Sequence, residues 1–261
     1  MMGTPLKNPP VYFTVAQVRF NTLLKLADYL PDLQERLRKA GYPAFSKHTA
    51  MAIEFGSSDG KQVVQPVARD QFLFATADQQ HAFVLASDAL TLQSTNYGTF
   101  EKFSGAFLVG VRHLHETVTL DFTERVGLRY LDYVLPRAGE ELTDYLVPEV
   151  LGLSRRLGGQ PSHAYSESLS TFGDIGLRAR VVIQNGGLGF PPDLLPGSMA
   201  LQSRFLERQG VHAILDTDGF FEGRKLFDLD AVGGQLDAIH EVICAAFKAT
   251  VTPAAVKSWD E

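Results

Sequence analysis

Two long segments of the chain place apolar residues at every third or fourth position. The first runs from Phe100 to Val118 and the second from Asp228 to Val251. Their apolar residues are Phe100, Phe103, Phe107, Val111, Leu114 and Val118 in the first and Leu229, Val232, Leu236, Ile239, Ile243 and Phe247 in the second. This spacing gathers apolar side chains on one face of an α-helix, and such a face needs a second layer to cover it. Each segment therefore predicts a long helix packed on another element.

Shorter segments rich in apolar and β-branched residues, bounded by turn residues, predict antiparallel strands. We expect strands at 11–20, 51–55, 71–75, 81–87 (continuing through Leu92), 126–135, 164–171, 176–184 and 212–220, a turn at 56–60, and shorter helices at 23–40 and 140–151. Strands and helices in this arrangement indicate the α+β class.

The order of these elements occurs twice along the chain. Each half begins with a strand and a short helix, continues with antiparallel strands and ends with a long helix. A matching signature, Leu-x-Asp-Tyr-Leu, occupies 26–30 and 142–146, and a proline follows it in both places. We predict two diverged copies of one α+β unit, residues 1–123 and residues 124–261. In each unit a curved antiparallel sheet would grip one long helix (a helix-grip-like fold), and the two units would pack as one body.

The composition is that of a protein with a packed core. Of 261 residues, 45% are apolar and 21% are charged. The N-terminus lacks the pattern of a secretory signal, and no apolar run approaches the length of a membrane span. The single cysteine excludes an internal disulfide and suits a reducing compartment. We therefore expect a cytoplasmic protein without membrane contact.

The net charge of −6 is unevenly distributed along the sequence. Residues 1–126 hold 12 basic and 12 acidic residues, whereas residues 127–261 hold 12 basic and 18 acidic residues. A protein that binds the phosphate backbone of nucleic acids usually carries a basic patch. The charge therefore disfavours nucleic acid as a partner and leaves a protein partner or a homo-oligomer as the expectation.

A pair of aspartates in the last predicted strand is a candidate site. Asp216 and Asp218 lie two residues apart, so their side chains share one face of the strand. A calcium loop is excluded because Phe220 occupies its third ligand position. Catalysis by the pair would need a third group such as Glu222 or His212. The alternative is that both aspartates are solvated residues near a strand end.

Two further candidates are Arg129 and Tyr97. Arg129 and Asp132 lie with Tyr130 and Tyr133 on the strand that joins the halves, where we expect an ion pair or hydrogen bond between the two units. Tyr97 belongs to an aromatic set that either lines a ligand pocket between helix and sheet or forms plain core.

Sequence motifs for cofactors are absent. Seven scattered histidines and one cysteine do not supply closely spaced zinc ligands. The glycines at Gly186, Gly187 and Gly189 lack both the lysine and the helix start of a phosphate-binding loop. We therefore expect no metal, no nucleotide and no other cofactor.

The stretch from Asp88 to Phe103 contains Leu-x-Leu-x-x-Thr-x-Tyr, and Gly127 to Tyr130 reads Gly-Leu-Arg-Tyr. With these landmarks the chain resembles a sporadically distributed bacterial family of uncharacterised proteins of about this length. The resemblance covers most of the chain and implies no catalytic residues. Because the patchy distribution suggests horizontally exchanged genes, it implies a role in bacterial defence or in a toxin–antitoxin pair.

Two functional hypotheses follow from the sequence. The first is a non-enzymatic interaction or regulatory protein that holds a partner at a sheet edge or on its acidic second half. The second is a small-molecule-binding module or an unrecognised hydrolase, with a pocket between a long helix and the sheet.

Overall fold

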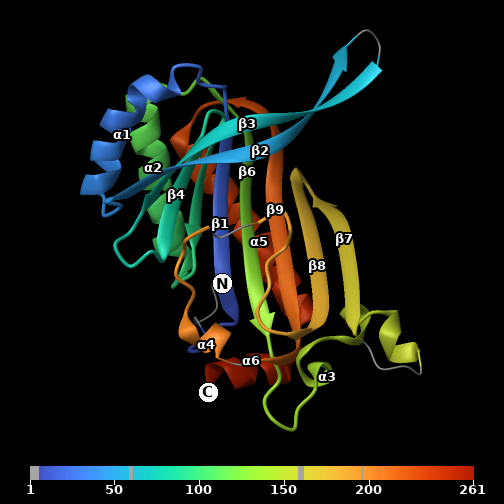
Figure 1. The fold of residues 1–261 in the computed structure, drawn as a ribbon. Helices are drawn as coiled ribbons and strands as arrows, with labels where there is room; N and C mark the ends of the chain where they lie inside the picture. Colours follow the sequence, from blue (N-terminus) through green and yellow to red (C-terminus); the bar gives the residue numbers. More distant parts are fainter. Residues whose placement is uncertain (1–5, 59–60, 158–161, 195–196, 208) are drawn as a thin grey trace.

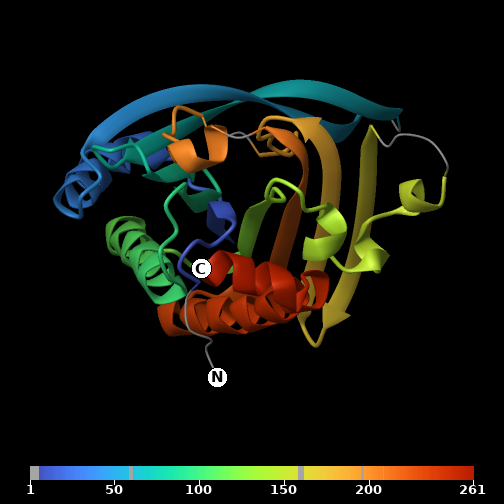
Figure 2. The same ribbon diagram turned by 90° about the horizontal axis from the view of Figure 1, so that it is seen from below.

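The computed structural model describes residues 6–58, 61–157, 162–194, 197–207 and 209–261. Its centre is an antiparallel sheet with the order β2-β3-β4-β5-β1-β6-β9-β8-β7 (Figure 1). Helices α2, α5 and α6 lie on one side of this sheet (Figure 2). The predicted α+β class is confirmed. Within the described residues, no helix is both long enough and apolar enough to cross a membrane.

The strands are β1 (Val11–Phe20), β2 (Ala44–Ser58), β3 (Lys61–Ala75), β4 (His81–Ala86), β5 (Ala89–Ser94), β6 (Phe122–Val134), β7 (His163–Phe172), β8 (Ile175–Gly186) and β9 (Gly210–Leu226). Strands β1 and β6, which begin the two predicted units, pair antiparallel at the centre of the sheet. The next strand outward is the last one of each half, β5 beside β1 and β9 beside β6. One sheet therefore runs through both predicted units, and their origin by duplication stays a prediction.

The helices are α1 (Leu26–Lys39), α2 (Phe100–Val118), α3 (Leu142–Tyr145), α4 (Ser203–Leu206), α5 (Leu229–Thr250) and α6 (Pro253–Asp260), with 3₁₀ turns at Pro148–Val150 and Leu153–Arg156. Thr99 caps α2 by accepting a hydrogen bond from the backbone N–H of Lys102. Asp228 caps α5 through the N–H groups of Asp230 and Ala231. Both long helices predicted from apolar periodicity are confirmed, because local spacing and a capping residue determine them together.

Two sequence predictions about elements are wrong. The helix expected at 140–151 is only the single turn α3, because Pro148 lacks an N–H group and its ring obstructs a continuing helix. The strands expected at 51–55 and 71–75 are confirmed, but they are longer than predicted and form the hairpin β2–β3. The turn expected at 56–60 is occupied by strand up to Ser58, and residues 59 and 60 lie outside the described residues.

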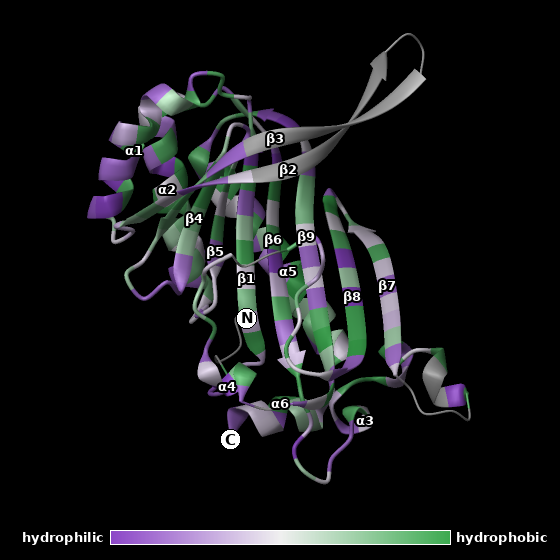
Figure 3. Ribbon diagram, in the orientation of Figure 1, coloured by the Kyte–Doolittle hydropathy of each residue, from purple (hydrophilic) through white to green (hydrophobic). Residues whose placement is uncertain are grey.

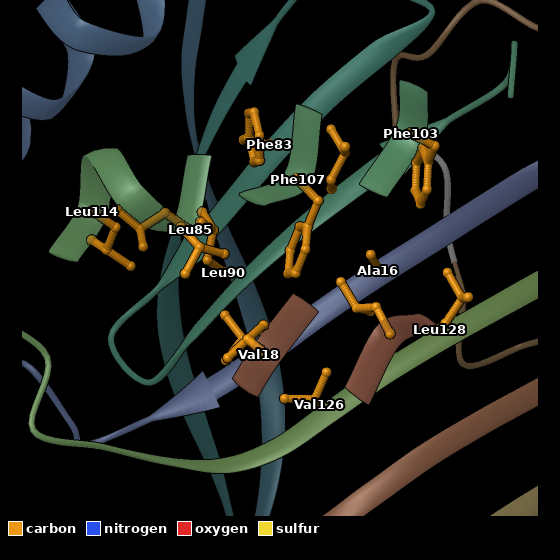
Figure 4. Packing of buried hydrophobic residues seen from close by; sticks show 14 of the residues in the cluster. Ala16, Val18, Phe83, Leu85, Leu90, Phe103, Phe107, Leu114, Val126 and Leu128 are labelled. Carbon is orange, nitrogen blue, oxygen red and sulfur yellow. The ribbon is translucent and has the colours of Figure 1, made fainter. Parts of the chain in front are cut away.

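The main core lies between the helices and the sheet. Phe107 and Leu114 of α2 lie in one cluster with Phe83 and Leu85 of β4 and Val18 of β1 (Figure 4), and all five side chains are buried. Helix α5 also packs closely against the central strands of the sheet. A Cβ atom at Gly219 of β9 would lie 2.5 Å from Cγ2 of Ile239, so only glycine leaves room for the helix there.

The opposite face of the sheet, here called the open face, carries no long helix among the residues that the structure describes. Residues 188–194 and 197–205 cover part of it, and Phe190 packs edge-on against Phe13 at 5.3 Å between ring centroids. The hairpin β2–β3 arches over the same face (Figure 2). Hydrophobic and hydrophilic residues alternate along β8 (Figure 3), as expected for a strand whose two faces have different surroundings.

Candidate functional site

Arg129 and Asp216 form a buried ion pair on the open face. The Arg129 guanidinium donates to both carboxylate oxygens of Asp216, from Nε at 2.6 Å and from Nη2 at 2.8 Å. Arg180 adds a third hydrogen bond to Asp216 at 3.1 Å. Arg129 also donates to Asp193 at 2.8 Å, which holds residues 188–194 against the sheet. Burial opposes the charge on Arg129, but the hydrogen bonds with Asp216 and Asp193 outweigh it, so the pKa of Arg129 is raised.

Asp218 belongs to a second ion pair on the same face. Arg125 donates to it at 3.3 Å and also reaches the side-chain oxygen of Gln17. Burial raises the pKa of Asp218, and the positive charge of Arg125 opposes that rise. Asp216 and Asp218 therefore share a face, as the strand spacing predicts. Each carboxylate is engaged by arginine, which is the chemistry of a structural network and not of a proton-accepting pair.

The network continues to the edge of the sheet. Arg180 donates to Glu167 of β7 at 2.6 Å, and the Tyr165 hydroxyl donates to the same carboxylate at 2.8 Å. Arg129 does not make the ion pair expected between the two units, but Tyr130 on the same strand makes a hydrogen bond between them, because its hydroxyl lies 2.9 Å from that of Tyr97. Residues three apart on a strand point to opposite faces, and both partners of Arg129 lie in the second half of the chain.

Tyr97 lies on the other side of the sheet, in a polar cluster under α5. Its hydroxyl lies 2.9 Å from that of Tyr130, which in turn lies 3.2 Å from Nδ1 of His240. The Sγ atom of Cys244, one turn later on α5, lies 3.4 Å from Nε2 of His240. Phe100 of α2 stacks on the His240 ring at 4.0 Å between centroids. Tyr97 is therefore not brought together with Asp216, Asp218 or Arg129.

Burial keeps this cluster uncharged near neutral pH. It raises the pKa of the Tyr97 hydroxyl and the Cys244 thiol and lowers the pKa of His240. A thiol, an imidazole and a tyrosine that contact one another in this order are the parts of an activated nucleophile. Here the thiol stays protonated, so the cluster offers hydrogen bonds instead of a thiolate.

Asp132 is a buried acid in this region whose surroundings sequence reasoning missed. It lies on β6 two residues after Tyr130, so its side chain points to the same face as Tyr130 and toward α5. The residue is only 6% exposed. Burial raises its pKa to about 7. The signal available in the sequence was an acid among the otherwise apolar inward positions of this strand.

The edge strand β7 is the third feature of interest. Only β8 pairs with it among the described strands, so one row of its backbone N–H and C=O groups faces outward. Tyr165, Leu169 and Phe172 are each at least half exposed. The strand contains no lysine and no proline, the residues with which proteins commonly protect an edge from pairing. Strand β7 is therefore open to a further strand.

No family model matches the chain. A search of curated proteins likewise found no match. Among the residues that the structure places, no three His, Cys, Asp or Glu side chains are grouped so that they could hold a metal ion. Proposals about function therefore depend on the geometry of the three features described above.

Proposed function

We propose that the protein is a non-enzymatic interaction protein that binds an extended segment of a partner protein along β7. The observation that carries the proposal is the ten-residue edge strand with its exposed apolar side chains. Addition of a strand to a sheet edge obtains affinity from backbone hydrogen bonds and specificity from alternate side chains.

The surroundings of β7 favour a segment of particular chemistry. Tyr165 and Leu169 share the open face, so apolar residues at alternate positions of the partner would pack beside them. The charge of Glu167 is already paired with Arg180 and does not oppose such a segment. Arg178 lies opposite Leu169 on β8 and has no ion pair within the described residues. An acidic residue in the partner segment would supply one.

The resemblance to a bacterial family suggests what such binding would accomplish. In a defence or toxin–antitoxin context, as the resemblance implies, the bound segment would belong to the protein whose action this chain regulates. We thus propose that this chain regulates its partner by binding the partner's extended segment, and that it carries out no chemical reaction itself.

Site-specific photocrosslinking in the native host tests this proposal. A photoreactive phenylalanine analogue in place of Leu169 should yield one discrete crosslinked protein, whereas the same analogue in place of the exposed Leu24, on the far side of the molecule from β7, should not. The purified partner should then bind the double variant Tyr165→Lys, Leu169→Lys at least about tenfold more weakly, because lysines at an edge oppose strand addition. Both positions are exposed, so thermal melting of the double variant should be unchanged.

The outcomes separate the possible occupants. A crosslinked dimer of this chain would show that the edge serves self-assembly and would contradict the proposed partner. Unchanged affinity of the lysine variant for a captured partner would show that the partner binds elsewhere and would refute the role of β7.

A further inference from the structure

A surface pocket with a volume of about 340 Å³ lies where three separate parts of the chain meet. Its walls come from the N-terminal segment 6–11, from the loop between β5 and α2, and from the start of α4. Six of the ten lining residues are polar, namely Lys7, Asn8, Asn96, Tyr97, Gln202 and Arg204. The volume is at the lower end of the range for small-molecule sites, so the pocket suits a small hydrophilic molecule.

The charge of the lining has one sign. Lys7 and Arg204 both line the pocket, and none of the described lining residues is acidic. Burial lowers the pKa of Arg204, and no carboxylate among the described residues opposes that shift. Glu261, whose charge is coupled to Lys7, is already paired with Arg137 at 2.8 Å. The pocket therefore concentrates positive charge and favours an anion.

Two contacts hold the guanidinium of Arg204 in place. Its Nε donates to Oε1 of Gln202 at 2.9 Å, and Gln202 donates from Nε2 to the backbone carbonyl of Thr95 at 2.7 Å. The guanidinium also lies over the ring of Phe205, with 4.1 Å between Cζ and the ring centroid. Within the described residues, neither Nη group of Arg204 has an ion pair. A guanidinium positioned in this way can donate in parallel to two oxygens of a carboxylate or a phosphate.

We propose that this pocket binds a small hydrophilic oxyanion, a carboxylate or a phosphate ester, through the guanidinium of Arg204, with Lys7 supplying a second positive charge. The side-chain amide of Asn96 donates to Gln80 at 2.8 Å, which leaves its carbonyl oxygen to accept from a hydroxyl group of the bound molecule. None of the lining residues belongs to β7, so this site is independent of the partner binding proposed above.

Three molecules of similar size test the need for negative charge and the kind of oxyanion. Glycerate carries a carboxylate, glycerol 3-phosphate carries a phosphate, and glyceramide is the neutral counterpart of glycerate. Thermal melting of the full chain at constant ionic strength should show saturable stabilisation by glycerate or by glycerol 3-phosphate, and none by glyceramide. The anion that stabilises the protein at the lower concentration identifies the oxyanion.

Substitutions locate the bound anion. The Kd of the better anion, measured by calorimetry, should rise by about tenfold or more in Arg204→Gln, which removes the charged hydrogen bonds to the ligand. Lys7→Gln should weaken binding to a smaller extent, because Lys7 is exposed. Arg112→Gln is the matched control, since Arg112 is an exposed residue of α2 outside the pocket, and it should bind like wild type.

A second measurement on the wild-type protein covers the case in which Arg204→Gln does not fold. In NMR titrations with the better anion, the backbone amide of Gly98 in the lining should shift, whereas that of Gly173 in the turn between β7 and β8 should not. The proposal would be overturned if neither anion stabilised the chain more than glyceramide does. Full affinity of Arg204→Gln, or a Gly98 amide that both anions leave unchanged, would also overturn it.

Discussion

Two single variants, Asp216→Ala and Asp193→Ala, should differ in their loss of stability and so distinguish a structural ion pair from a surface contact. Both carboxylates bind the same guanidinium of Arg129, but Asp216 is 1% exposed and Asp193 is 54% exposed. Removing one partner of a buried pair typically costs about 3–5 kcal/mol because a buried charge remains. Arg129 keeps Asp193 and Arg180 keeps Glu167, so we expect the lower end for Asp216→Ala, about 3 kcal/mol. The exposed Asp193→Ala should cost less than about 1 kcal/mol.

Urea unfolding at pH 7, followed by circular dichroism, measures both costs. In thermal melts the Asp216→Ala change should appear as a fall of roughly 6–12 °C, given the usual relation between stability and melting temperature for chains of this size. The double variant Arg129→Met, Asp216→Ala should recover part of the loss, because it removes the stranded charge together with its partner. Equal costs for Asp216→Ala and Asp193→Ala would refute the view that the buried pair organises the open face.

Two other predictions concern the helix side of the sheet. Phe107→Ala should destabilise the protein by about 3–5 kcal/mol in urea unfolding, as expected for deletion of a buried ring. The control Val109→Ala, on the exposed side of α2, should change stability by about 0.5 kcal/mol or less. A cost below about 1 kcal/mol for Phe107→Ala would contradict the burial of this face. Because the folded pKa of Asp132 is about 7 and its unfolded value is about 4, the native state holds a proton that the unfolded state releases in this window. Wild type should therefore lose stability relative to Asp132→Asn as pH rises from about 4 to about 7, and a constant difference across this range would show that the carboxyl titrates normally.

The parts of the fold that sequence predicts are those fixed by neighbours along the chain. Helix α2 follows from its apolar spacing and from Thr99, and β1 begins and ends where its residue pattern does. Helix α3 shows the limit of the method, since the pattern around Glu140 to Leu151 is helical until Pro148 interrupts it. The length of the β2–β3 hairpin depends on pairing between distant residues, which no local pattern contains.

The candidate site was predictable only in fragments. That Asp216 and Asp218 share a face follows from strand geometry, but their arginines come from β6 and β8, and Arg129 is 87 residues from Asp216 in the sequence. Tyr97 was found through its aromatic neighbours, while its hydrogen-bond partner Tyr130 and the partner of Tyr130, His240, both come from the second half of the chain. Asp132 was considered only as a partner of Arg129, because its true surroundings, the inner face of the sheet under α5, appear only after folding.

The central pairing of β1 with β6 has a consequence for how the chain could be divided. The connection between α2 and β6 is short. A cut there would place β1 and β6 in different fragments and leave every other pair of neighbouring strands within one fragment. Each fragment would then expose the edge that its counterpart matches along almost the whole strand. Two fragments expressed separately in one cell should therefore reassociate through the β1–β6 pairing. The protein is thus suited to use as a split reporter, in which reassociation of the fragments restores the centre of the sheet.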